Sequence, residues 1–207
     1  MTLREQFEGG GGVPDPVVAP DLLIIVATVD DAEVLAPLGR PASDEAPVTP
    51  VLVATGPDPL GVDAVLDDLA APAGRLLLLD GPCDTWAEEA ARLVVRLDAL
   101  VAEEPPAGVV VRGGSEAALA AARAALAAGV PLLHLLTGTD DPRSAATQAA
   151  VAELAAWQTS PEGGATYPTE IDLLVHRRLV PPPSRARHAD TTVVRMPSTR
   201  SSRSRSA

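Results

Sequence analysis

Short apolar runs recur along the chain, and each pair of runs is separated by enough residues for one helix. The runs are rich in Leu, Val and Ile and are bounded by turn residues, which is typical of buried parallel strands. This pattern predicts strands over Leu22–Thr28, Val48–Ala54, Arg75–Leu79, Val109–Val111 and Pro131–Leu136. Ile171–Val175 is one more short apolar run.

Segments with helical spacing of apolar residues lie between these runs. Asp58 and Ser115 are suited to cap the N-termini of two of them. The predicted helices are Asp30–Leu38, Asp58–Leu69, Thr85–Glu103, Ser115–Ala128 and Ser144–Gln158. Strands that alternate with helices indicate an α/β fold, here a Rossmann-like parallel sheet with helices on both faces.

Composition divides the chain of 207 residues into three parts. Residues 1–20 hold Gly9–Gly12 and three prolines, which predicts a flexible leader. Residues 21–176 hold all the predicted elements and form the expected Rossmann-like domain. Residues 177–207 are rich in Pro, Arg and Ser and have too few apolar residues for a core, which predicts a disordered tail.

Charge is divided in the same way. Residues 1–176 hold 27 acidic residues and eight Arg, whereas residues 177–207 hold eight Arg and one acid, Asp190. The acidic body argues against nucleic-acid binding, because phosphate contacts need positive charge. The basic tail could contact an acidic partner, but a solvated tail is the favoured interpretation.

The number of cysteines and the length of the apolar runs narrow the class of protein further. Cys83 is the only cysteine, so an internal disulfide is excluded, and a buried or loop thiol is the favoured interpretation. No apolar run is long enough to span a bilayer, and no signal peptide is visible, so we expect a cytoplasmic protein. His, Cys, Asp and Glu show no metal-ligand spacing, and we expect neither metal nor cofactor.

Candidate chemistry centres on the turn Gly113–Ser115, between a predicted strand and a helix N-terminus. Backbone N–H groups there can bind an anion, but the turn is no G-x-G-x-x-G fingerprint and carries no positive charge of its own. We therefore favour a tight turn with a Ser cap. His134 lies in an apolar strand, where packing is more common than catalysis. Acid pairs such as Asp30-Asp31 are interpreted as helix-end or surface charges.

Three blocks of the chain resemble one enzyme family. Ala27–Leu38, ATVDDAEVLAPL, aligns with a segment G-T-R-P-E-A-I-K-M-A-P-L, and Thr55–Leu66, TGPDPLGVDAVL, aligns with T-G-Q-H-x-x-M-L-D-x-V-L. Val109–Gly138 aligns with V-x-V-x-G-D-T, an alanine-rich helix and G-I-P-V-x-H-V-E-A-G. In these blocks the chain resembles the N-terminal half of the non-hydrolysing UDP-N-acetylglucosamine 2-epimerases.

That resemblance implies one half of a two-domain, GT-B-like enzyme that binds its substrate between the domains, often as a homodimer. The family interconverts UDP-N-acetylglucosamine and UDP-N-acetylmannosamine by eliminating UDP and adding it back. Such chemistry needs carboxylates for proton transfer and cations for the diphosphate. The family's aspartate falls on Gly114 and its glutamate on Leu136, while its Arg and Lys fall on Val29 and Val34. The resemblance therefore implies a degenerate member.

The second domain of the family has almost no counterpart here. It opens with a strand and H-R-R-E, which Val175-His176-Arg177-Arg178 resembles, so His176 is a weak catalytic candidate. No other catalytic residue is expected. The ligand-binding candidates that the resemblance implies are Gly113, Gly114, Ser115, His134 and Gly138.

Three interpretations follow from these residues. The leading one is an epimerase-like pseudoenzyme that acts as a binding or interaction subunit in nucleotide-sugar metabolism. It would form a homo- or hetero-oligomer with a nucleotide-sugar enzyme and could bind a UDP-sugar. The second is an epimerase component, an isomerase, that is active only with a partner chain supplying the second domain. The third is a decayed gene product.

Overall fold

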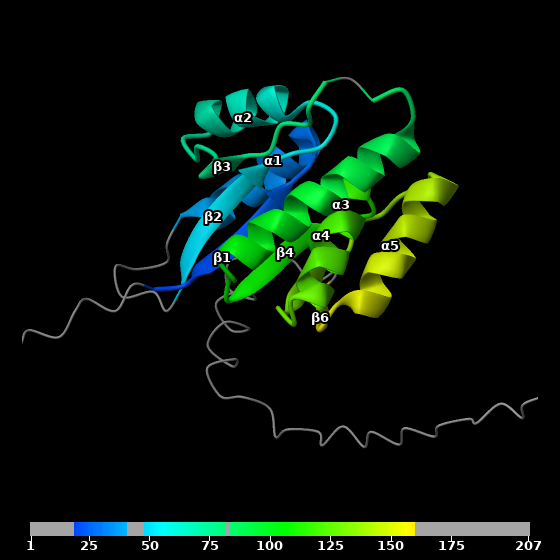
Figure 1. The fold of residues 1–207 in the computed structure, drawn as a ribbon. Coiled ribbons are helices and arrows are strands. Elements are labelled where there is room, and N and C mark those ends of the chain that lie inside the picture. The colour runs from blue at the N-terminus through cyan, green and yellow to red at the C-terminus, as the bar shows by residue number, and fades with distance from the viewer. Residues whose placement is uncertain (1–18, 41–47, 82, 160–207) are drawn as a thin grey trace, which may run out of the picture.

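The computed structural model describes residues 19–40, 48–81 and 83–159, which form one α/β unit (Figure 1). Six strands make a single sheet in the order β3-β2-β1-β4-β5-β6, and all neighbours pair in parallel. The prediction of a Rossmann-like parallel sheet is therefore confirmed. The strands are β1 Asp21–Val26, β2 Thr49–Ala54, β3 Arg75–Leu76, β4 Gly108–Arg112, β5 Leu132–Leu135 and β6 Trp157–Thr159.

Helices cover both faces of the sheet. The core on one face is made with α1 and α2, and the core on the other with α3, α4 and α5 (Figure 1). Successive side chains of a strand point to opposite faces, so in β1 Leu23 and Ile25 enter one core while Ile24 and Val26 enter the other. The helices are α1 Val29–Leu35, the short 3-10 helix η1 Ala36–Gly39, α2 Pro59–Asp68, α3 Trp86–Glu103, α4 Glu116–Ala127 and α5 Pro142–Leu154.

Helix α4 is built largely from alanine, and small side chains let it lie close to the sheet and to α3. Leu93, Leu97 and Val101 of α3 repeat once per turn and are almost fully buried in the same core. This packing fixes the N-terminus of α4, where the turn Gly113–Ser115 is attached. The buried alanines of α4 are Ala117, Ala118, Ala120, Ala121, Ala122, Ala124 and Ala125.

Each of the five α-helices in the described residues begins at a side chain that caps it. Every cap accepts a hydrogen bond from the backbone N–H three residues further on, over 2.8–3.2 Å. The predicted caps Asp58 and Ser115 are confirmed. Because each helix runs antiparallel to the strands, all five capped ends lie at the carboxyl edge of the sheet. The caps are Thr28, Asp58, Thr85, Ser115 and Asp141.

Two predicted helices have different bounds in the structure. The helix predicted over Asp30–Leu38 ends at Leu35 and continues as η1. The helix predicted over Ser144–Gln158 begins at Pro142, because proline is well suited to the first turn of a helix. It ends at Leu154, after which the chain becomes extended and enters β6, a strand that the sequence did not predict.

The strand predicted over Arg75–Leu79 is also too long. The strand is Arg75–Leu76, which pairs with β2 at the outer edge of the sheet, and Leu77 N donates to Ala54 O over 2.9 Å. Leu77 still packs in the core, whereas Leu78 is 47% exposed. Because β3 lies at the edge of the sheet, β2 is its only strand neighbour. The strand therefore ends where its pairing with β2 ends.

Several predictions concern residues beyond the described part of the chain. These are the leader up to residue 18, the apolar run Ile171–Val175, His176 and the tail 177–207. The domain bounds therefore stay predictions. No helix among the described residues is long and apolar enough to cross a membrane.

Candidate functional site

The candidate site lies at the carboxyl edge, where β1 and β4 are neighbours. The chain leaves β1 toward α1 on one face and leaves β4 toward α4 on the other. The strand order therefore reverses between β1 and β4, which makes this the topological switch point of the sheet. Doubly wound sheets usually bind their ligands in the crevice at such a point. The residues that follow these two strands, and those that follow β5, form the site.

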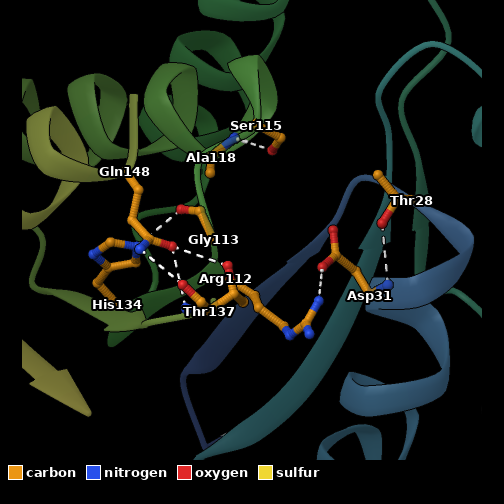
Figure 2. Close-up of polar contacts among 9 residues, drawn as sticks. All are labelled: Thr28, Asp31, Arg112, Gly113, Ser115, Ala118, His134, Thr137 and Gln148. Carbon is orange, nitrogen blue, oxygen red and sulfur yellow. Dashed lines mark hydrogen bonds and ion pairs between the residues drawn. The ribbon is translucent and has the colours of Figure 1, made fainter. Parts of the chain in front are cut away.

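An ion pair joins the two sides of this crevice. Arg112 Nη1, at the end of β4, donates to Asp31 Oδ1, in the first turn of α1, over 2.7 Å (Figure 2). The Asp31 side chain is 8% exposed and that of Arg112 is 22% exposed. Arg112 Nε is buried and has no hydrogen-bond partner among the described residues. Asp31 lies at a helix end, as expected, and its side chain is buried rather than exposed.

The turn Gly113–Ser115 follows Arg112 directly. Gly113 is buried with φ of +64°, a left-handed conformation that favours glycine. Ser115 Oγ accepts a hydrogen bond from Ala118 N over 3.1 Å and so caps α4 (Figure 2). This geometry is that of a tight turn with a Ser cap, the interpretation that the sequence favoured.

Helix α5 lies directly against this turn. A Cβ added to Gly114 would be 2.1 Å from the backbone oxygen of Ser144 and 2.6 Å from the backbone N of Gln148. Real Cβ atoms do not approach backbone atoms so closely, so the position accepts glycine alone. The backbone of α5 thus occupies the space that a side chain at residue 114 needs.

His134 is buried beneath the turn. Its side chain is 0% exposed, and Nε2 lies 2.9 Å from the carbonyl oxygen of Gly113 (Figure 2). Burial lowers the pKa of His134, and the hydrogen bond to Gly113 offsets part of that effect. The ring is therefore neutral at pH 7, with Nε2–H as donor and a buried Nδ1 that has no partner among the described residues. Such packing agrees with the expectation for a histidine in an apolar strand.

A clamp between α5 and the segment after β5 completes this cluster. Gln148 Oε1 accepts from Thr137 N over 3.1 Å and from Thr137 Oγ1 over 3.0 Å. Gln148 Nε2 donates to the Thr137 carbonyl oxygen over 3.0 Å (Figure 2). Sequence reasoning missed both residues. A signal was present, since Thr137 follows a strand at the carboxyl edge, but nothing local paired it with a glutamine eleven residues away.

The remaining predicted residues lie beside this cluster. Gly138 follows Thr137, is exposed, and has open space where a Cβ would be. Leu136 is half-buried, and its N–H donates to Thr159 O over 2.8 Å. The structure thus brings Gly113, Gly114, Ser115 and His134 together, with Gly138 at the edge of the group.

Positive charge near the turn comes from Arg112, which pairs with Asp31, and from Arg143 of α5, which is also paired. Arg143 Nη2 lies 2.7 Å from Glu116 Oε1, in the first turn of α4. The Arg143 guanidinium also stacks over the Trp86 ring, 4.2 Å from its centroid. Trp86 itself is 58% exposed. Through these two contacts Arg143 connects the N-terminal ends of α3, α4 and α5.

Two further features of the described residues concern possible metal ligands and the thiol. Among these residues, no three His, Cys, Asp or Glu side chains gather as a metal site. Cys83 is a free thiol of intermediate exposure. It lines a groove of about 440 Å³ between the N-terminal ends of α2 and α3.

His134 gives stability a pH dependence of definite sign. Its pKa is lowered in the folded chain, so below about pH 6.5 the unfolded chain binds a proton that the folded chain resists. The free energy of unfolding should therefore fall as the pH drops below that value. His134→Gln should flatten this fall between about pH 7 and 5.5 in urea unfolding curves. Equal slopes for the variant and the parent chain would contradict the assignment.

A doubly wound sheet with its switch point between β1 and β4 defines the class of this protein, a Rossmann-like α/β protein. Neither the known protein-family models nor the curated protein sequences contain a match to the chain. Among solved structures, however, UDP-N-acetylglucosamine 2-epimerases share its fold.

Three of these structures illustrate the likeness. The Neisseria meningitidis UDP-GlcNAc 2-epimerase, bound to UDP-GlcNAc, is 21% identical with a TM-score of 0.61, over 76% of this chain and 43% of the enzyme. The S. aureus MnaA–UDP structure is 22% identical with a TM-score of 0.60, over 76% and 42%. The Methanocaldococcus jannaschii UDP-GlcNAc 2-epimerase is 19% identical with a TM-score of 0.59, over 76% and 43%.

The chain thus spans less than half the length of the epimerases that it matches. The fold expected from the three aligned blocks is confirmed. Identities near 20% show a shared fold, and the activity of the enzymes does not follow from them.

Proposed function

We propose that this chain is a UDP-N-acetylglucosamine 2-epimerase-like protein without epimerase activity, which serves as a binding or interaction subunit in nucleotide-sugar metabolism. The contact between α5 and Gly114 carries the proposal, because the family's aspartate falls on this position. Backbone atoms lie within 2.6 Å of where its Cβ would be. At the second acid position, Leu136 has no ionisable group. Both family acid positions therefore lack the carboxylate that proton transfer at a sugar needs.

The carboxyl edge supports a role in binding a partner. Large apolar side chains are exposed there: Val29 (43%) begins α1, Leu60 (60%) is in the first turn of α2, Leu78 (47%) follows β3, and Trp86 (58%) begins α3. Exposed apolar residues gathered on one edge are typical of an interaction surface. Five capped helices and two continuous cores favour a maintained protein over a decayed gene product.

An activity assay tests the first half of the proposal. The purified chain is incubated with UDP-N-acetylglucosamine, and UDP-N-acetylmannosamine is followed by proton NMR. We expect no conversion above the rate without protein, even at high protein concentration and after long incubation. Steady conversion that scales with the amount of chain would overturn the pseudoenzyme assignment.

A binding assay tests the second half. Sedimentation velocity of the chain mixed with a full-length UDP-N-acetylglucosamine 2-epimerase of the same organism should show a complex. Val29→Arg, at the edge, should weaken it about tenfold or more. Val95→Arg is the matched control, since Val95 is 68% exposed on α3 away from the capped ends. Absence of a complex, or equal weakening by both variants, would count against the edge as the partner surface.

A second candidate function is an epimerase component completed by a partner chain. It is favoured by one observation, the match to only 42–45% of the length of the aligned enzymes. The same NMR assay distinguishes it when the chain is mixed with a separate chain that carries the rest of such an enzyme. Turnover in the mixture alone supports this candidate, and turnover in neither sample supports the first.

A further inference from the structure

The groove lined by Cys83 is acidic and apolar. Its described lining residues include the exposed leucines Leu60 and Leu78, together with Leu79 and two prolines. It also includes two carboxylates, Asp58 and Glu89, and no Arg, Lys or His. Its volume of about 440 Å³ fits a few side chains of a peptide segment. The occupant that suits it is therefore a segment with adjacent apolar and cationic residues.

One stretch of this chain beyond the described residues has that composition. Ile171-Asp172-Leu173-Leu174-Val175 contains four apolar residues and is followed at once by His176-Arg177-Arg178. The apolar residues match the leucines of the groove, and the two arginines match its carboxylates. We propose that residues 171–178 dock into this groove of the same chain.

Chain length permits this docking. β6 pairs in parallel with β5, so the chain leaves the sheet after Thr159 at the carboxyl edge, the edge that carries the groove. Four strand spacings separate β6 from β2, about 19 Å in all. The eleven residues 160–170 reach up to about 36 Å when extended. The tether is therefore long enough to reach the groove, and short enough to hold the segment near it at high effective concentration.

When residues 171–178 cover the groove, a partner that binds this part of the carboxyl edge must displace them. Docking removes Leu60 and Leu78 from water and neutralises carboxylates that have no cation beside them in the groove. The inference does not depend on the proposed function, because it concerns the chain alone and needs neither UDP-sugar nor enzyme.

Cys83 provides a direct test, since it is the only thiol of the chain and lines the groove. Leu174→Cys in the full chain should form a disulfide with Cys83 within the monomer under mild oxidation, detected by peptide mapping. Val194→Cys, in the tail, is the matched control and should form none. A disulfide that links two chains instead would show docking in trans, and equal cross-linking of both variants would show no specific docking; either result overturns the proposal.

Thiol reactivity gives a second measurement without an added cysteine. Alkylation of Cys83 by the neutral reagent N-ethylmaleimide should speed up about tenfold or more when Leu173→Asp and Leu174→Asp are combined. Val193→Asp with Val194→Asp, the same change in the tail, should leave the rate unchanged. Circular dichroism shows whether each variant keeps the fold. Equal rates in all three proteins would contradict the docking, as would a parent rate that rises on dilution, which marks a second copy as the occupant.

Discussion

Gly114→Asp is expected to lower the free energy of unfolding by about 3 kcal/mol, although aspartate is the residue of the resembled family. The first side-chain atom would lie 2.1 Å from Ser144 O and 2.6 Å from Gln148 N. Both are backbone atoms of α5, so relief requires the helix to move away from the turn. That movement would break the hydrogen bonds between Gln148 and Thr137. Thermal unfolding should show a Tm lower by roughly 6 °C or more for a domain of this size.

Gly138→Asp is the matched control for this change. Gly138 is exposed, and no atom lies within 4 Å of the Cβ position. Its stability should change by less than about 0.5 kcal/mol. Gly114→Ala separates charge from volume, because its Cβ alone meets the same backbone atoms and should cost most of the same stability. If Gly114→Asp proved as stable as Gly138→Asp, the view that α5 closes this acid position would fail.

The parts of the fold that the sequence predicted are those with local signals. β1 is apolar on both faces because both are covered, so Leu22–Ala27 is a continuous run in the sequence. Asp58 and Ser115 mark helix starts because a cap bonds to a residue only three positions away. The edge strand β6 carries no such signal. Trp157–Thr159 has only three residues, too few to show a period.

The candidate site was predictable to the same extent. Gly113 and Ser115 were correctly placed at a turn between strand and helix, because both ends of the turn are visible in the sequence. The glycine at 114 was interpreted as the loss of a catalytic acid. The physical reason for a glycine at this position is the backbone of α5. The α5 residues that contact it lie 30 or more positions further along the chain. Contacts at that separation depend on how helices pack and leave no pattern in the sequence.

The ion pair at the crevice is the clearest example of a contact hidden from sequence. Asp31 and Arg112 are 81 residues apart and meet because β1 and β4 pair in the register Ile24 to Val110. Each follows an apolar strand at the carboxyl edge, a signal too general to select these two from the other charged residues. Asp31 is buried against Arg112, whereas its neighbour Asp30 is exposed.

Arg112→Met is expected to lower the free energy of unfolding by about 3 kcal/mol or more, because it leaves the Asp31 carboxylate buried without its cation. Arg75→Met is the matched control. Arg75 pairs with Glu104 over 3.4 Å at the surface, where the side chains are 49% and 75% exposed. Exposed pairs contribute less than about 1 kcal/mol. Urea unfolding of both variants measures the difference.

A double variant separates the stability of the pair from the cost of breaking it. Asp31→Leu combined with Arg112→Met removes both charges together, and we expect it to recover most of the loss, since replacing a buried ion pair with apolar residues is often neutral. Recovery would mean that the pair adds little net stability, so that another property, such as holding a guanidinium at the switch point, explains its presence there. If Arg112→Met instead cost no more than Arg75→Met, the crevice would be held by the separate packing of α1 and α4 on the sheet.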